Sequence, residues 1–191
     1  MKNVLVAYAT RMGATAEIAE AIADELRSAD LAVDVRACSP DLDAAGYDAV
    51  VIGSPVYLNR WLKDAVDYLK RHATELSRRP VWLFQSGPCG EGAADEQIGA
   101  PVAVRKAAIL IGTDPPRTFG GRLDRTKATG PVSRWMATGT YEGDFRDFDK
   151  IRAWASSIAG ELTQPSSNGE TRHRPAVPQS RRRHSRIKVD R

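Results

Sequence analysis

Three short segments of the chain combine small residues, hydroxyl groups and glycines in patterns that suit an anion or a planar ring. The first, residues 9–15 (ATRMGAT), lies between an apolar run and a helical pattern. Small residues let the backbone curl around a tetrahedral anion, so that successive N–H groups and the hydroxyls of Thr10 and Thr15 point at it. A plain helix cap stays open as the alternative, with Thr10 in the N-cap region and Gly13 easing the turn.

The pattern of this first segment limits which phosphate compound it suits. It contains neither GxxxxGKS/T nor GxGxxG, the patterns that hold a triphosphate or a dinucleotide. Hydroxyls and amides without an essential lysine suit a monophosphate instead.

The second segment, residues 54–61 (SPVYLNRW), offers a flat apolar wall to a planar ring. Trp61 is expected to be a core residue of the helix that follows. Tyr57 is therefore the candidate for contact with the ring.

The third segment, residues 86–92 (SGPCGEG), places Gly87 and Gly90 on either side of Pro88 and Cys89. Backbone amides beside glycine can approach a ligand edge closely, and a flavin needs such donors because charge appears on its polar edge on reduction. An ordinary flexible loop is the alternative. With no histidine nearby in sequence, Cys89 is expected to be a space-filling thiol rather than a nucleophile.

Alternating strand and helix patterns position these segments. Strand patterns cover residues 3–8, 31–37, 47–53, 80–85 and 117–123, and helical stripes cover 13–27, 62–69, 102–111 and 149–162. A further short helix is considered near 132–137. Five strands separated by helices predict an α/β fold, a doubly wound parallel sheet covered on both faces. Ligands of such sheets bind at the carboxyl ends of the strands, where the three segments emerge.

Charge divides the chain into two parts. The 191 residues carry a formal net charge of +4, and residues 165–191 alone carry +6, which leaves −2 for residues 1–164. We expect one folded domain over 1–164 and a basic disordered tail over 165–191. The run RRRHSR in this tail is interpreted as a solvated extension, with nucleic acid or anionic lipid as the alternative ligand. Nothing else in the chain supports a specific nucleic-acid partner.

Composition also bounds the cellular setting and the metal chemistry. Cys38 and Cys89 form neither a zinc pattern nor a disulfide framework. No apolar run reaches the ~20 residues that a membrane-spanning helix needs. We expect a cytoplasmic protein without a metal site.

Several motifs together resemble one family. The TRxGxT run of residues 10–15 resembles the phosphate loop of flavodoxin-domain proteins, in particular the branch that contains menaquinone-dependent protoporphyrinogen IX dehydrogenase. GSPVY at 53–57, followed by RWLK at 60–63, is similar to the second flavin loop of small bacterial members. FGGRLD at 119–124 resembles the fifth strand of that family, and EGDFRDFD at 142–149 the start of its last helix. The match spans roughly residues 3–162.

The resemblance implies a five-stranded sheet of order 2-1-3-4-5 in a three-layer α/β/α sandwich, with flavin mononucleotide (FMN) held non-covalently. It places the phosphate on Thr10, Arg11, Met12, Gly13, Ala14 and Thr15. It places the ring at Ser54, Pro55, Val56, Tyr57, Ser86, Gly87, Pro88, Cys89 and Gly90, with Asn59 and Arg60 near the ring or its rim. No side chain is nominated as catalytic.

Two functions of different classes follow. The chain is an FMN-dependent oxidoreductase, with the oxidation of protoporphyrinogen IX and transfer of electrons to a quinone as the specific case, or it is a flavodoxin-type one-electron carrier between redox partner proteins. A third alternative keeps the fold without FMN as a partner-binding domain.

Two departures from carrier flavodoxins favour the enzyme. The third segment has no aromatic residue, so one ring face is open or is covered by Trp135 or another residue of 125–147. A charge of only −2 over residues 1–164 also lacks the strong acidity of the carriers.

The segment 125–147 carries four cations: Arg125, Lys127, Arg134 and Arg146. These suit porphyrin propionates and peripheral contact at the inner face of the membrane. Pairing with Asp124, Glu142, Asp144 and Asp147 on a solvated surface is the favoured interpretation.

Overall fold

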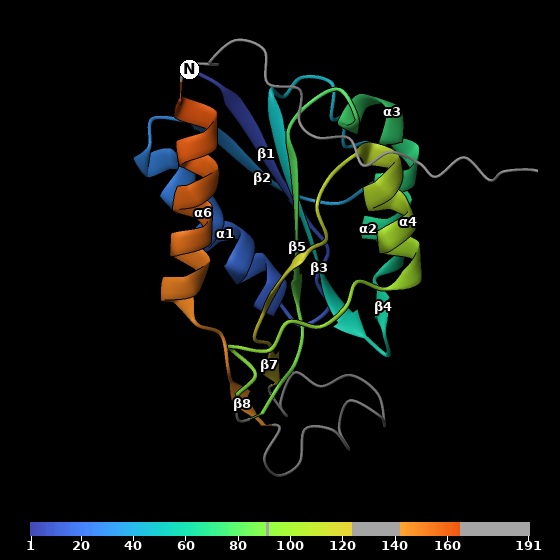
Figure 1. Ribbon diagram of the computed structural model, residues 1–191, viewed down its shortest axis with the longest axis vertical. Coiled ribbons are helices and arrows are strands. Elements are labelled where there is room, and N and C mark those ends of the chain that lie inside the picture. The colour runs from blue at the N-terminus through green and yellow to red at the C-terminus, as the bar shows by residue number, and fades with distance from the viewer. Residues whose placement is uncertain (91, 124–141, 165–191) are drawn as a thin grey trace, which may run out of the picture.

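A computed structural model describes residues 1–90, 92–123 and 142–164 of the chain (Figure 1). Its main sheet contains five parallel strands in the order β2-β1-β3-β5-β6. Their bounds are β1 (Asn3–Tyr8), β2 (Ala32–Ala37), β3 (Ala49–Tyr57), β5 (Val81–Ser86) and β6 (Arg117–Phe119). Counted as five parallel strands, this is the predicted order 2-1-3-4-5, which is confirmed.

Two layers of helices cover the sheet. Figure 1 shows α1 (Ala14–Ser28) and α6 (Phe148–Thr163) on one face, and α2 (Lys63–Arg71), α3 (Ala73–Leu76) and α4 (Val102–Ile111) on the other. The three-layer α/β/α arrangement is therefore confirmed.

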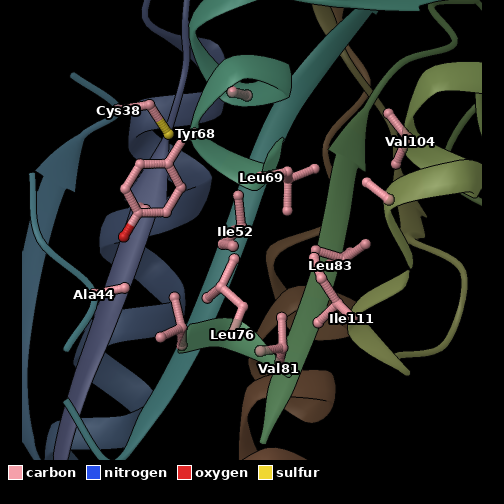
Figure 2. Close-up of a cluster of buried hydrophobic side chains, with 14 of the residues drawn as sticks. Cys38, Ala44, Ile52, Tyr68, Leu69, Leu76, Val81, Leu83, Val104 and Ile111 are labelled. Atoms are coloured by element: carbon pink, nitrogen blue, oxygen red, sulfur yellow. The ribbon is translucent and has the colours of Figure 1, made fainter. Parts of the chain in front are cut away.

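The strands at the centre of the sheet are apolar on both faces because helices pack on both sides. The stretches Val4–Ala7 and Ala49–Ile52 are completely buried. Alternate residues of these strands belong to the two core clusters, one under α1 and α6 and one under α2, α3 and α4. Figure 2 shows part of the second cluster, in which Leu69 of α2 lies near Ile52 of β3 and Tyr68 of α2 lies beside Cys38.

The strand register brings the three chemistry-bearing segments to one edge of the sheet. Tyr8 at the end of β1 pairs with Gly53, and Pro55 of β3 pairs with Ser86 at the end of β5. The segments that follow β1 and β5 therefore emerge beside the end of β3.

The structure differs from the sequence prediction around residue 54. The second segment is not a loop, because β3 continues to Tyr57 and turns back as β4 (Arg60–Trp61), which pairs antiparallel with it. Trp61 is a core residue as predicted, only 5% exposed, but it lies in β4 rather than in the next helix.

The strand predicted over residues 117–123 forms two short strands instead of one. β6 ends at Phe119, and residues 122–123 form β7 (Arg122–Leu123), which pairs antiparallel with β8 (Gly143–Asp144). The chain leaves the sheet at Gly121, whose N–H donates to the carbonyl of Pro88 and whose carbonyl accepts from Phe145. The helix considered near 132–137 lies outside the described residues.

The described residues contain neither a membrane-spanning helix nor a cluster of metal ligands. Within ranges 1–90, 92–123 and 142–164, no helix is both long and apolar enough to cross a membrane. Within the same ranges, no three His, Cys, Asp or Glu side chains gather in a way that could hold a metal ion.

Candidate functional site

The first segment ends in a helix start that is free to bind an anion. Gly13 is the N-cap of α1 with φ +86°, a left-handed conformation that favours glycine, and no side chain in the part of the chain that the structure describes caps this end. The first-turn amides of a helix have no partner within the helix, and its dipole favours negative charge there. The end of α1 therefore presents several N–H donors at the edge of the sheet where β1 ends.

Thr10 organises the turn before this helix. Its Oγ1 accepts a hydrogen bond from the N–H of Gly13 at 3.0 Å. A hydroxyl that accepts one hydrogen bond still has its own proton to donate. The structure thus agrees with one part of the helix-cap alternative: Thr10 holds the turn before the helix. It does not cap the N-terminal amides of α1, which have no side-chain partner among the described residues.

Contacts between side chains bring the three segments together. The hydroxyls of Thr15 and Ser86 lie 2.8 Å apart and are buried, which joins the first segment to the third. The guanidinium of Arg11 lies 5.8 Å from the ring centre of Tyr57, which joins the first segment to the second. The three segments are therefore neighbours in the fold, although the sequence separates them by up to about 80 positions.

The second segment forms a braced hairpin. Ser54 is fully buried; its hydroxyl accepts from the N–H of Leu62 at 3.0 Å and donates to the carbonyl of Pro55 at 3.0 Å. Val56 and Tyr57 are partly exposed, while Asn59 and Arg60 are exposed at and after the turn. Burial raises the pKa of Tyr57, so its phenol is neutral at physiological pH. Ser54 and Pro55 are buried, so Val56 and Tyr57 are the residues of the 54–57 stretch that a ring can reach from solvent.

The third segment is held from outside the loop. The N–H of Gly87 donates to the carbonyl of Phe119, and the carbonyl of Pro88 accepts from Gly121. Gly90 is buried and has φ +118°. Burial, with a smaller effect of Asp144, raises the pKa of Cys89 to about 11, so the thiol is protonated at neutral pH. Cys89 packs with Met12 against Leu123, which agrees with the predicted space-filling role.

A group of charged residues next to α1 was not predicted as part of the site. Arg122 donates two hydrogen bonds to the carboxylate of Glu17, at 2.8 and 2.7 Å. Arg146, whose side chain is 2% exposed, donates to Glu17 at 2.8 Å, to Asp144 at 2.7 Å and to the carbonyl of Ala14 at 3.3 Å. Its guanidinium also lies 4.9 Å from the ring centre of Phe148.

This ion-pair group changes the electrostatics of the helix start. Burial acts to raise the pKa of Glu17, but the hydrogen bonds from Arg122 and Arg146 outweigh it and the pKa is lowered. A methyl group built on Gly13 would lie 3.9 Å from the guanidinium of Arg122, so this cation stands beside the helix start. Two arginines thus balance the two carboxylates, and an anion bound here does not face an uncompensated Glu17.

The expectation for Arg146 is wrong in one respect. Pairing with Asp144 is confirmed, but the arginine is buried rather than on a solvated surface. Its other partner, Glu17, is 129 residues away, so the sequence offered no spacing signal for that pair. Trp135, Arg125, Lys127 and Arg134 lie outside the described residues.

The arrangement fits a monophosphate joined to a flat ring. Uncapped amides, the Thr10 hydroxyl and the adjacent Arg122 surround the helix start. Tyr57 and the glycine-rich third segment lie beside it through the contacts of Arg11 and Thr15.

The chain is similar in sequence and in fold to known proteins. The family model of the flavodoxin domain matches residues 5–129. The chain is similar to protoporphyrinogen IX dehydrogenase [quinone] of Escherichia coli strain K12, with 34% identity over 86 residues that cover 43% of this chain and 46% of that protein. The same protein of Escherichia coli O157:H7 matches with the same identity and coverage. The match thus spans less than half the length of these relatives.

Solved structures share the architecture at low sequence identity. A flavodoxin from the domain Archaea aligns over 85% of this chain and 99% of its own, with 16% identity and a TM-score of 0.55. Flavodoxin 2 from Bacillus cereus aligns over 83% and 99%, with 17% identity and a TM-score of 0.56. The flavodiiron protein from Giardia intestinalis aligns over 84% of this chain and 36% of its own, with 15% identity and a TM-score of 0.57.

Proposed function

The chain belongs to the flavodoxin-domain family, and on that premise we propose that residues 1–164 bind FMN and act as an oxidoreductase. The observation that carries the proposal is the uncapped start of α1, with Gly13 and Thr10 in place and the second and third segments joined to it. A fold alone does not assign function, so the argument rests on this site.

In this proposal the phosphate lies at the start of α1, within reach of backbone amides and the Thr10 hydroxyl. The residues that hold it are Thr10, Arg11, Met12, Gly13, Ala14 and Thr15. The Thr15 hydroxyl, which is buried against Ser86, orients the third segment toward the first. Arg122 neutralises Glu17 and keeps the helix start favourable to an anion.

The ring lies between the hairpin and the third segment. Bound FMN supplies redox chemistry, because its ring system accepts and releases electrons. The residues proposed to contact it are Ser54, Pro55, Val56, Tyr57, Ser86, Gly87, Pro88, Cys89 and Gly90, with Asn59 and Arg60 at the rim. Backbone amides of the third segment offer hydrogen bonds to the polar edge of the ring, where negative charge appears on reduction.

As a finer proposal, the reaction is the oxidation of protoporphyrinogen IX with a quinone as acceptor. The support is the similarity to the E. coli dehydrogenase, which covers 43% of this chain. A membrane quinone as acceptor implies peripheral contact at the inner face of the membrane. The carrier function, with redox proteins as partners, is the alternative that the experiments below separate.

Comparing FMN with riboflavin tests the phosphate site directly. The full chain, stripped of any bound chromophore, is titrated with each compound while quenching of flavin fluorescence is followed. Charge-assisted hydrogen bonds contribute about 1.5–3 kcal/mol each, so two of them make FMN bind at least about 100-fold more tightly than riboflavin. Equal affinities for FMN and riboflavin would show that the phosphate does not bind at the start of α1. Absence of binding by both compounds would disprove the FMN proposal.

A second experiment tests the finer reaction. The FMN-loaded protein is mixed anaerobically with protoporphyrinogen IX, and loss of flavin absorbance is followed before and after menadione is added. Rapid bleaching and recovery over many cycles support the dehydrogenase. Reduction only through a partner protein favours the carrier and leaves FMN binding intact.

A further inference from the structure

A groove lies beside the turn of the hairpin that carries Tyr57. Its walls come from the β3–β4 turn, α2 and α4, and its volume is about 990 Å³. Figure 1 shows β4, α2 and α4 together on one face of the sheet. Neither Tyr57 nor residues 86–90 line it. The groove shares only Asn59 and Arg60 of the hairpin turn, the proposed rim of the ring site, with the site described above.

The rim of the groove exposes large apolar side chains. Leu58 at the hairpin turn is 84% exposed, and Val102 and Leu110 of α4 are 54% and 69% exposed. Ile109, the neighbour of Leu110, is 76% exposed. With Met1, these four complete the exposed large hydrophobics of the described residues. Such a concentration on one face of a protein marks an interaction site.

The hairpin turn presents Leu58 in an unfavourable conformation. Leu58 and Asn59 have φ of +47° and +56°, as in a two-residue turn of type I′. Such turns favour Asn-Gly or Asp-Gly, because a leucine in the left-handed region is sterically disfavoured. Since Leu58 is also exposed, it contributes little to the core, and a strained exposed residue of this kind points to a functional role.

The walls of the groove carry positive charge on both sides. Lys63 and Lys70 come from α2 and Lys106 from α4. Lys63 pairs with Asp67, whereas Lys70 and Lys106 make no ion pair within ranges 1–90, 92–123 and 142–164. α4 contains no acidic residue. The groove therefore combines an apolar floor with two exposed lysines, Lys70 and Lys106, that make no ion pair within the described residues.

We propose that this groove binds an amphipathic helix of a partner protein, with an apolar face against the floor and acidic residues against Lys70 and Lys106. An α-helix about 10 Å in diameter fills roughly 420 Å³ per turn, so the groove accommodates about two turns. The occupant is not the chain's own basic segment 165–191, which carries +6 and is repelled by the lysines. A lipid surface is the other class of occupant, and the test below includes it. This inference goes beyond the proposed function and does not depend on it.

The test uses a probe of defined chemistry on the full-length chain. A fluorescein-labelled helical peptide of about 14 residues, with leucines on one face and glutamates on the other, is compared by anisotropy with the same peptide carrying lysines. We expect the glutamate peptide to bind at least about 30-fold more tightly, since like charges oppose the lysine peptide.

Three substitutions locate the binding surface. Lys70→Glu and Lys106→Glu each weaken binding of the glutamate peptide by about tenfold, because each turns an attraction into a repulsion. Arg105→Glu is the matched control: it makes the same change at the neighbouring exposed position of α4, outside the lining of the groove. It changes the affinity by less than about threefold, a long-range effect that salt screens.

Leu58→Asn separates docking from folding. Asparagine tolerates the left-handed conformation, so the melting temperature stays the same or rises while peptide affinity falls. A structural role for Leu58 would instead lower the melting temperature.

Four outcomes would overturn the proposal: no binding up to about 1 mM peptide, equal binding of both peptides, an effect of Arg105→Glu as large as that of Lys106→Glu, or unchanged affinity in Leu58→Asn. Binding to phosphatidylglycerol vesicles that Lys70→Glu and Lys106→Glu abolish, without a preference between peptides, would assign the face to lipid.

Flavin content is measured for every variant. A flavin-loaded chain that ignores the peptide disproves only the docking, and a peptide-binding chain without flavin disproves only the FMN proposal.

Discussion

Thr10 shows how one hydroxyl serves both the backbone and a ligand. Its oxygen accepts the N–H of Gly13, which fixes the turn, and its proton is left to donate. Thr15 differs, because its hydroxyl is buried 2.8 Å from that of Ser86. Two threonines that looked equivalent in the sequence therefore have different surroundings: the Thr10 hydroxyl keeps its proton for a phosphate, whereas the Thr15 hydroxyl is bonded to Ser86 and Thr15 is proposed to meet the phosphate through its backbone N–H.

The Thr10→Val substitution should weaken FMN binding by about 1.5–3 kcal/mol, since it removes a donor to a charged group. Riboflavin, which has no phosphate, should bind with unchanged affinity. Both dissociation constants are obtained by fluorescence titration. Thr163→Val, at the far end of α6, is the matched control and should leave both constants unchanged. An FMN affinity of Thr10→Val equal to that of the control would remove Thr10 from the phosphate site.

At the scale of elements, the link between β6 and β7 supports the third segment. Gly121 donates to the carbonyl of Pro88, and its position lies against the backbone of that segment. A methyl group on Gly121 would lie 2.4 Å from the carbonyl oxygen of Gly87 and 2.9 Å from the sulfur of Cys89. The third segment is thus shaped by a link between strands that comes about 30 residues later in the chain.

Gly121→Ala should displace the third segment and so weaken FMN binding by about tenfold or more. The overpacking should also destabilise the fold by about 1–3 kcal/mol. Flavin affinity is compared with the free energy of unfolding in urea. Gly160→Ala, where a methyl group meets nothing within 4 Å, should bind FMN normally and be equally or more stable. Normal flavin affinity in Gly121→Ala would show that this link does not shape the site.

At the scale of the whole molecule, an ion-pair group ties together distant parts of the chain. Arg122 of β7 and Arg146 bind Glu17 of α1, and Arg146 also binds Asp144 of β8. The hydrogen bond from Arg146 lowers the pKa of Asp144, and the two arginines lower that of Glu17 against the effect of burial. Both carboxylates therefore stabilise the fold when ionised.

This linkage gives stability a defined dependence on pH. Because both pKa values are lower in the folded than in the unfolded chain, their contribution is present above about pH 5 and is lost as the pH falls below that value. Arg146→Met should destabilise the protein by about 1–3 kcal/mol at pH 7, less than for a fully buried pair because the carboxylates are half exposed.

The same variant should lose less stability than the wild type between about pH 7 and pH 3, since part of the pH-dependent stabilisation is already gone. Urea unfolding at both pH values measures the difference. Arg152→Met, which breaks an exposed pair with Asp149 on α6, is the matched control and should keep the wild-type pH dependence. Equal pH dependence in Arg146→Met and the wild type would contradict the assignment.

The sequence predicted the architecture because the buried residues follow local patterns of apolar side chains. Apolar runs such as Val4–Ala7 and the stripe of Ile18, Ile22 and Leu26 are buried as their spacing indicates. The family resemblance, drawn from the motifs at residues 10–15 and 53–63, is confirmed by the match over residues 5–129. Turns were less predictable: the Leu58-Asn59 turn lacks the glycine that signals a two-residue hairpin, so the hairpin was missed.

By itself, then, the sequence determined the five parallel strands and the main helices, and which segments emerge at the ligand edge, because the periodicity of burial repeats over a few residues. Only the tertiary structure decided the partners: Glu17 with Arg122 and Arg146, Gly121 against Gly87, and Leu58 beside the lysines of α2 and α4. Such pairs join positions up to 129 residues apart. Their contact depends on how the layers pack, and no local pattern encodes that packing.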